Sequence, residues 1–239
     1  MKHTSTVKFN WQEYLKYFSL KLLILLLISD LLFISIHGLD WLTRASYINL
    51  PISEVFIYQE LLPITKDQSY AEAFQYTKEL WIMLILGFGY WQRKKKLFLA
   101  WSLLFGYLLL DDFLGIHEKF GGRISYLFQD SFGLRAIDYG ELLISATVGI
   151  TFLLFIRYYY RQSSFLERKY CKILIFLLLG LAISGIIFDL IHVVFTNNRY
   201  LDTIFALLED GGEQIVMSAT LAFVYKINWK HQESSFAQG

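Results

Sequence analysis

Six stretches of this sequence are apolar over the length that a helix needs to cross a bilayer. A transmembrane helix takes roughly 20 residues, and the six stretches are 20–39, 72–92, 97–117, 138–156, 173–195 and 204–225. Hydrophobic residues make up 55% of the chain, and its mean hydropathy is +0.42. This composition is typical of membrane proteins. The sequence therefore predicts an all-α fold, an integral membrane helical bundle of about six transmembrane helices.

The second stretch is the least apolar of the six. Only residues 80–91 are continuously apolar there, so a full crossing has to place Lys78 and Glu79 at the outer interface. We assign residues 1–230 to a single transmembrane helical domain and residues 231–239 to a cytoplasmic tail.

Basic residues indicate how the chain is oriented. The N-terminal segment holds four, residues 93–96 four, residues 157–172 five and the end of the chain two, which together are 15 of the 22 Lys and Arg. All of these segments fall on one side of a six-helix chain. Because cytoplasmic segments carry such an excess of Lys and Arg, we predict that both termini are cytoplasmic.

Overall charge and cysteine content exclude some classes of function. The 22 basic residues nearly balance 21 acidic ones, so the sequence gives no reason to expect nucleic acid as a partner. Cys171 is the only cysteine, which excludes an internal disulfide and a metal site made of several cysteines. We expect membrane lipids as the surrounding partner, and the sequence does not indicate an oligomeric state.

Acids and histidines inside the apolar stretches are the strongest signal of function. A charged side chain at membrane depth costs of order 3 kcal/mol on insertion scales, so such residues mark functional sites. With alternating helix directions, His37, His117 and His192 come late in outward-running helices, whereas Glu209 and Glu213 come early in an inward-running one. All of these residues therefore fall toward the outer ends of their helices, which predicts one site near the outer face.

Helical spacing supports convergence of these side chains, since residues three, four or seven apart share a face. Asp111 and Glu118 are seven apart, and Asp189 and His192 form an Asp-x-x-His pair. Several of these residues have alternative explanations. Asp112 and Glu118 would also be accounted for as solvated groups at the interface, and His37 as a hydrogen-bonded residue at a helix end. Asp30 is the deepest acid, and a hydrogen bond to a neighbouring helix, aided by its neighbour Ser29, would account for it. Glu79 would be accounted for by an ion pair with Lys78.

A faint internal repeat accompanies this pattern. Each intramembrane histidine follows an isoleucine, and the sequence after Gly140 is similar to that after Gly212. Three helical hairpins related about the membrane normal would form a parallel-repeat architecture. We retain three hairpins as an expectation.

Carboxylates and imidazoles that converge from several helices are the ingredients of a metal site. Imidazole with carboxylates favours Fe, Mn or Zn, and a zinc with three protein ligands keeps a position for an activated water. We predict a transition metal ion, with Zn or Fe preferred, and Glu213 and Asp112 as catalytic residues. The candidate ligands are His117, Asp189, His192, Glu209, Glu213, Asp111, Glu118 and His37.

Two motifs carry a resemblance to a known group of proteins. Asp-Asp-x-x-x-x-His-Glu at 111–118 and Glu-Asp-x-x-Glu at 209–213 resemble the acidic-His-Glu and acidic-pair-Glu motifs of an uncharacterised family of bacterial polytopic membrane proteins. The segment 70–79 is similar to their segment before a helix. The resemblance implies a site and a location in a bacterial inner membrane, but it implies no reaction.

Three classes of function remain open from the sequence. We favour a metal-dependent membrane enzyme, a hydrolase or an oxidoreductase, that acts on a lipid or lipid-soluble substrate at the outer leaflet. The alternative is a proton- or ion-coupled transporter or channel that uses the same acids. A haem-binding electron carrier ranks last, because two histidine ligands would not require so many nearby carboxylates.

Overall fold

The computed structural model describes residues 15–46, 64–65, 69–195 and 198–236, and their regular structure is helical apart from an isolated bridge between Ser131 and Leu134. In chain order the elements are α2 (Leu20–Ser46), α3 (Tyr70–Arg93), α4 (Lys96–Leu114), α5 (Ile116–Ile124), the 3-10 turn η2 (Ser125–Leu127), α6 (Ala136–Arg161), α7 (Phe165–Ala182), the π-helical segment η3 (Ile183–Phe188), α8 (Asp189–Phe195) and α9 (Arg199–Phe236). The predicted all-α class is confirmed.

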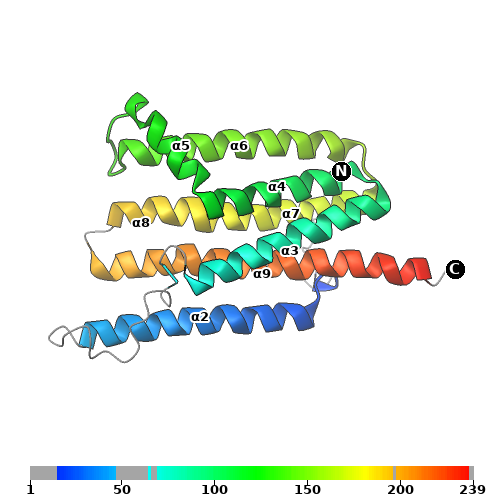
Figure 1. Ribbon diagram of the computed structural model, residues 1–239, viewed down its shortest axis with the longest axis horizontal. Helices are drawn as coiled ribbons and strands as arrows, with labels where there is room; N and C mark the ends of the chain where they lie inside the picture. The colour runs from blue at the N-terminus through cyan, green and yellow to red at the C-terminus, as the bar shows by residue number, and fades with distance from the viewer. Residues whose placement is uncertain (1–14, 47–63, 66–68, 196–197, 237–239) are drawn as a thin grey trace, which may run out of the picture.

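The long helices lie side by side and alternate in direction (Figure 1). α9 lies in the middle of the bundle and packs against α2, α3, α7, η3 and α8. α4 packs against α3 and α6, and α5 packs against α6. The ends of α2, α4 and α8 therefore lie at the same end of the bundle as the beginnings of α3, α6 and α9. We call this end the acidic end, because the site described below lies there.

Four of the described helical segments are long and apolar enough to cross a membrane: Leu20–Leu39, Lys96–Leu114, Ala136–Arg161 and Phe165–Phe195. The chain is accordingly an integral membrane protein. α3 and α9 complete the six predicted stretches but do not reach this level of apolarity. Both helices place polar side chains inside the protein, where neighbouring helices rather than lipid surround them, for example Lys78 on α3 and Gln214 on α9. Six crossings and three repeated hairpins stay predictions.

The third predicted helix, 97–117, is wrong at its end. α4 stops at Leu114, and Gly115 adopts a left-handed backbone with φ 58°, a conformation that glycine takes without steric cost. Its N–H donates to the Asp111 carbonyl as a helix cap. The chain then turns into α5, so His117 and Glu118 belong to a separate short helix. The shared helical face predicted for Asp111 and Glu118 does not exist.

α5 lies unusually close to α6. A Cβ atom at Gly121 would overlap the backbone of Glu141, and one at Gly140 would overlap the carbonyl of Gly121. The helices can approach this closely because neither Gly121 nor Gly140 has a side chain. The contact between them fixes the direction in which α5 leaves α4. The packing thereby holds His117, at the start of α5, near the first turn of α6.

The apolar helical segment Phe165–Phe195 is interrupted between α7 and α8. Residues Ile183–Phe188 form a π-helical segment, a feature that is rare and often found at functional sites. Gly185 lies within it, and a Cβ atom there would overlap the carboxylate of Glu213 on α9. The π-helical segment therefore brings α7 and α9 together at the level of Glu213 and sets the positions of Asp189 and His192 beyond it.

Candidate metal centre

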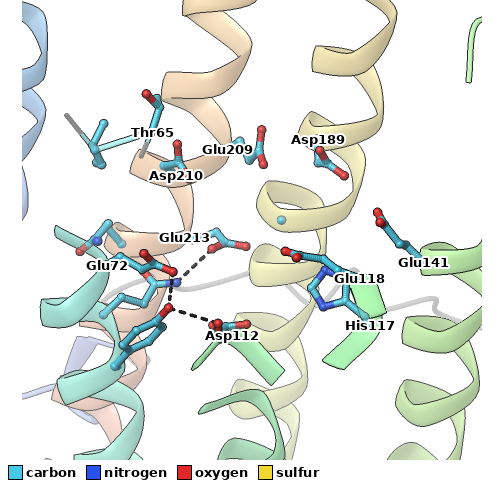
Figure 2. A pocket seen from close by; sticks show the side chains of 15 residues that line it. Thr65, Glu72, Asp112, His117, Glu118, Glu141, Asp189, Glu209, Asp210 and Glu213 are labelled. Carbon is cyan, nitrogen blue, oxygen red and sulfur yellow. Dashed lines mark hydrogen bonds between the residues drawn. The ribbon is translucent and has the colours of Figure 1, made fainter. Parts of the chain in front are cut away.

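A polar cavity of about 260 Å³ lies at the acidic end of the bundle. Eight acidic side chains and one histidine line it, and no Lys or Arg is among its described lining residues. Figure 2 shows these side chains pointing inward from α3, α4, α5, α6, α8 and α9. The acids are Glu72, Asp112, Glu118, Glu141, Asp189, Glu209, Asp210 and Glu213. We call this space the acidic cavity.

Asp189, His192 and Glu209 form a compact group at its edge: Asp189 and Glu209 line the cavity, and His192 lies beside Glu209 outside the lining. One ligand atom from each lies within 4.8 Å of the other two, and all three side chains are half-buried. His192 Nδ1 lies 3.1 Å from Glu209 Oε2. Asp189 and His192 lie one turn apart on α8, and Glu209 on α9 faces them. These three were among the predicted ligands, and we call them the triad group.

The triad group fits a transition metal by its chemistry. Imidazole and carboxylate are both donors that Zn and Fe accept, and three protein ligands leave a position open at catalytic zinc sites. The half-buried location inside an acidic cavity adds a favourable potential for a cation. The residues present therefore suit the predicted Zn or Fe, while the geometry does not choose between them.

His117 forms a second polar group across the cavity. Its Nδ1 lies 3.1 Å from Asp111 Oδ1, and its backbone N–H donates to the same oxygen at 2.8 Å. This contact with Asp111 raises the pKa of His117, and the charges of Glu118 and Glu141 act in the same direction. Figure 2 shows His117, Glu118 and Glu141 close together. Asp111 thus holds His117 in place, and Glu118 enters the cavity from α5.

The two predicted catalytic acids lie at the floor of the cavity. Glu213 Oε2 accepts a hydrogen bond of 3.0 Å from Gln75 Nε2. Tyr76 donates to the Asp112 carbonyl at 3.1 Å and also bonds to the Glu72 carboxylate. Gln75, Tyr76 and Glu72 were not predicted as site residues. Two signals for them were present in the sequence: the polar start of the weakly apolar second stretch, and the resemblance of segment 70–79 to the uncharacterised family.

His37 does not line the acidic cavity. It is buried on α2, which packs against the opposite side of α9 from α8 (Figure 1). His37 lies at a depth similar to that of the triad group. The central helix α9 separates them, so His37 does not reach the triad group.

Asp30 and Lys78 form an ion pair within a buried hydrogen-bond network. Lys78 Nζ donates to Asp30 Oδ1 at 3.0 Å and to Gln214 Oε1 at 2.8 Å, and Ser218 Oγ donates to Asp30 Oδ2 at 2.5 Å. Asp30 and Lys78 are 0% and 1% exposed. Asp30 thus bonds to neighbouring helices as the alternative explanation held. Ser29 takes no part in this network, because its hydroxyl donates to its own helix at the Leu25 carbonyl.

Glu79 does not form the ion pair with Lys78 that was the alternative explanation for it. It is 0% exposed, and among the described residues no N–H donor reaches either carboxylate oxygen, whose close neighbour is the Asp112 carboxylate. The Lys78 ammonium points to Asp30 and α9 instead. The acids whose charges act on Glu79 are Asp112 and Glu213, so it extends the acidic cavity inward.

Comparison with known proteins gives a family and no activity. No curated protein and no solved structure matches the chain. A family model matches residues 22–227, which include every described residue that lines the acidic cavity. The chain belongs to the family described as a domain of unknown function, DUF8692.

Proposed function

We propose that the protein is a metal-dependent membrane enzyme whose triad group binds one transition metal ion, Zn or Fe, and whose substrate is lipid-like. The observation that carries the proposal is that one ligand atom each of Asp189, His192 and Glu209 lies within 4.8 Å of the other two, at the edge of a cavity whose described lining has no Lys or Arg. A metal bound there would act as a Lewis acid and would activate water.

Electrostatics supports a bound cation. Carboxylates this close together repel one another, and burial strengthens the repulsion, because water that would screen it is excluded. A divalent ion relieves part of this repulsion at the triad group. Arg135 pairs with Asp138 at 2.7 Å outside the cavity lining, and its charge also acts on Asp189. One guanidinium shared with Asp138 leaves most of the eight cavity acids uncompensated.

The remaining cavity residues have roles as proton carriers. Glu213 and Asp112 lie where they would accept or return a proton during hydrolysis, and Gln75 orients the Glu213 carboxylate. His117, held by Asp111, faces them and is the third candidate. A hydrolase suits this combination of a metal site and proton-transferring groups, and an oxidoreductase is the second reaction class.

We expect purified protein to contain close to one equivalent of a single transition metal by elemental analysis, in line with a three-ligand site. Chelation should remove the metal, and zinc or iron should restore it to the same stoichiometry. Metal-free protein that takes up solute into liposomes with proton dependence, an activity lost in Asp30→Asn, would support the transporter instead. The buried Lys78–Asp30 pair is the feature that favours that alternative.

The acidic end is proposed to face the outside of a bacterial inner membrane, with both chain termini in the cytoplasm. The basic excess at the other end of the helices supports this orientation. We expect green fluorescent protein fused to the C-terminus to fluoresce and alkaline phosphatase fused there to be inactive. The opposite pattern would reverse the orientation and place the acidic end in the cytoplasm.

A further inference from the structure

A second cavity, of about 310 Å³, adjoins the acidic cavity. The two share Gln75, Asp112, His117, Gly185 and Glu213. Beyond these residues the second cavity is lined mainly by aliphatic side chains of α4, α6, α7 and η3. It therefore has a polar end next to the acidic cavity and an apolar body, and we call it the apolar cavity.

The body of the apolar cavity runs along the helices. Its lining on α7 and η3 extends from Ile175 to Ile186, which is about 16 Å at the helical rise. This is about half of the ~30 Å hydrocarbon core of a bilayer, the depth of one leaflet. Its deep residues on the other two helices are Leu104 and Leu153, consistent with their directions in Figure 1. A single hydrocarbon chain matches this shape.

The cavity also reaches the outside of the bundle. Leu153 on α6 and Leu179 on α7 line it, yet they are 43% and 57% exposed. α6 packs chiefly on α5 and α4 and only lightly on α7. A hydrocarbon chain in the surrounding lipid would enter between α6 and α7 without crossing water.

The polar end determines which head group fits. Its acids are Glu79, Asp111, Asp112 and Glu213, and no Lys or Arg is among the described lining residues. Phosphate or carboxylate head groups would be repelled there. One divalent ion at the triad group would leave most of the negative charge uncompensated, so a cationic head group has the complementary charge.

Unpartnered groups at the polar end call for a hydrogen-bond donor. Among the described residues, no N–H donor reaches either oxygen of the fully buried Glu79, whose close neighbour is the Asp112 carboxylate, and the hydroxyl of Tyr107 has no hydrogen-bond partner; all three side chains line the apolar cavity. A buried polar group without a partner costs about 1–3 kcal/mol. A primary ammonium offers three donors in a compact charge, which a quaternary ammonium does not.

We propose that the apolar cavity binds a single-chain amphiphile with a primary amine head group, whose ammonium is held by Glu79 with Asp112 and Glu213 and whose chain lies between α4, α6 and α7. Its identity as the substrate rests on the function proposed above. Its binding does not, because Glu79 and the apolar lining lie outside the triad group.

Binding of radiolabelled tetradecylamine to the protein in phosphatidylcholine nanodiscs tests the proposal, with empty nanodiscs as the baseline. We expect saturable binding, weakened roughly tenfold or more in Glu79→Gln, as for loss of a charge-assisted hydrogen bond. Tetradecanol, tetradecanoate and tetradecyltrimethylammonium should compete poorly. Equal competition by any of these three, or no saturable binding above empty nanodiscs, would overturn the proposal.

A cavity-filling variant tests the location. Gly149 lines the apolar cavity and has open space at the position of a Cβ, so Gly149→Phe should fill the cavity and abolish tetradecylamine binding. Ile150→Phe is its matched control, because Ile150 is 58% exposed on the same helix and outside the lining. Equal binding by both variants would contradict the location.

Metal content separates this proposal from the proposed function. Glu79→Gln and Gly149→Phe should keep the metal content of the unaltered protein, and His192→Ala should keep amine binding. Amine binding without metal in the unaltered protein would leave the amphiphile site standing and remove the metalloenzyme. Metal without amine binding would do the reverse.

Discussion

Purified His192→Ala protein is expected to contain less than about a tenth of an equivalent of transition metal, since loss of a direct ligand should weaken binding at least as much as the roughly 10–100-fold that loss of an outer-shell partner costs. His192 supplies the only imidazole of the triad group and contacts Glu209 at 3.1 Å. Without it two carboxylates remain, and they resemble many exposed acid pairs that hold no metal. Elemental analysis after size-exclusion chromatography measures the loss.

His37→Ala is the matched control for this experiment. His37 is also a helix-borne histidine in the bundle, but it lies on α2 away from the acidic cavity. We expect its metal content to equal that of the unaltered protein. Circular dichroism of both variants verifies that the helices are retained. Equal metal content in the two variants would show that the triad group is not the site.

Replacing Lys78 with Met is expected to lower the free energy of unfolding by about 3–5 kcal/mol, the usual result of removing one partner of a buried ion pair. Asp30 would keep its buried carboxylate and retain only the Ser218 hydroxyl among the partners described above. Gln214 would lose its contacts with the ammonium. Thermal and denaturant unfolding in detergent, followed by intrinsic fluorescence, measures the change.

Two further variants make this result specific. Lys95→Met removes the exposed pair with Glu167, which lies at 3.5 Å with Lys95 52% exposed, so it should change stability by less than about 1 kcal/mol. Adding Asp30→Asn to Lys78→Met should recover part of the lost stability, because no uncompensated charge remains buried. A double variant as unstable as the sum of the two single variants would refute the ion pair as the cause.

Residue type and position predicted three residues that the structure brings close together. Asp189, His192 and Glu209 were chosen from their depth and their three-residue or inter-helix spacing, and they come together in the structure. The reason is that alternating helix directions already sort residues by depth, and spacing on one helix fixes a shared face. Those relations are readable from one sequence.

The partners of other site residues could not be predicted from the spacing of residues along one helix. Lys78 and Glu79 are adjacent in the sequence, which favoured an ion pair between them. On a helix, adjacent residues point in different directions, so Lys78 reaches Asp30 and Gln214 while Glu79 faces the apolar cavity. The unpaired state of Glu79 therefore follows from the positions of α2 and α9.

The sequence by itself determined that this chain is a helical membrane protein with acids and histidines concentrated toward one end of its helices. Apolar length and charge cost at membrane depth are local properties, and they act whatever the packing. Only the tertiary structure decided which of these residues meet. The placement of α9 in the middle, the left-handed Gly115 and the π-helical segment before Asp189 rotate and separate the helices. They put His37 outside the site, move His117 onto α5, and open an apolar cavity beside the acids.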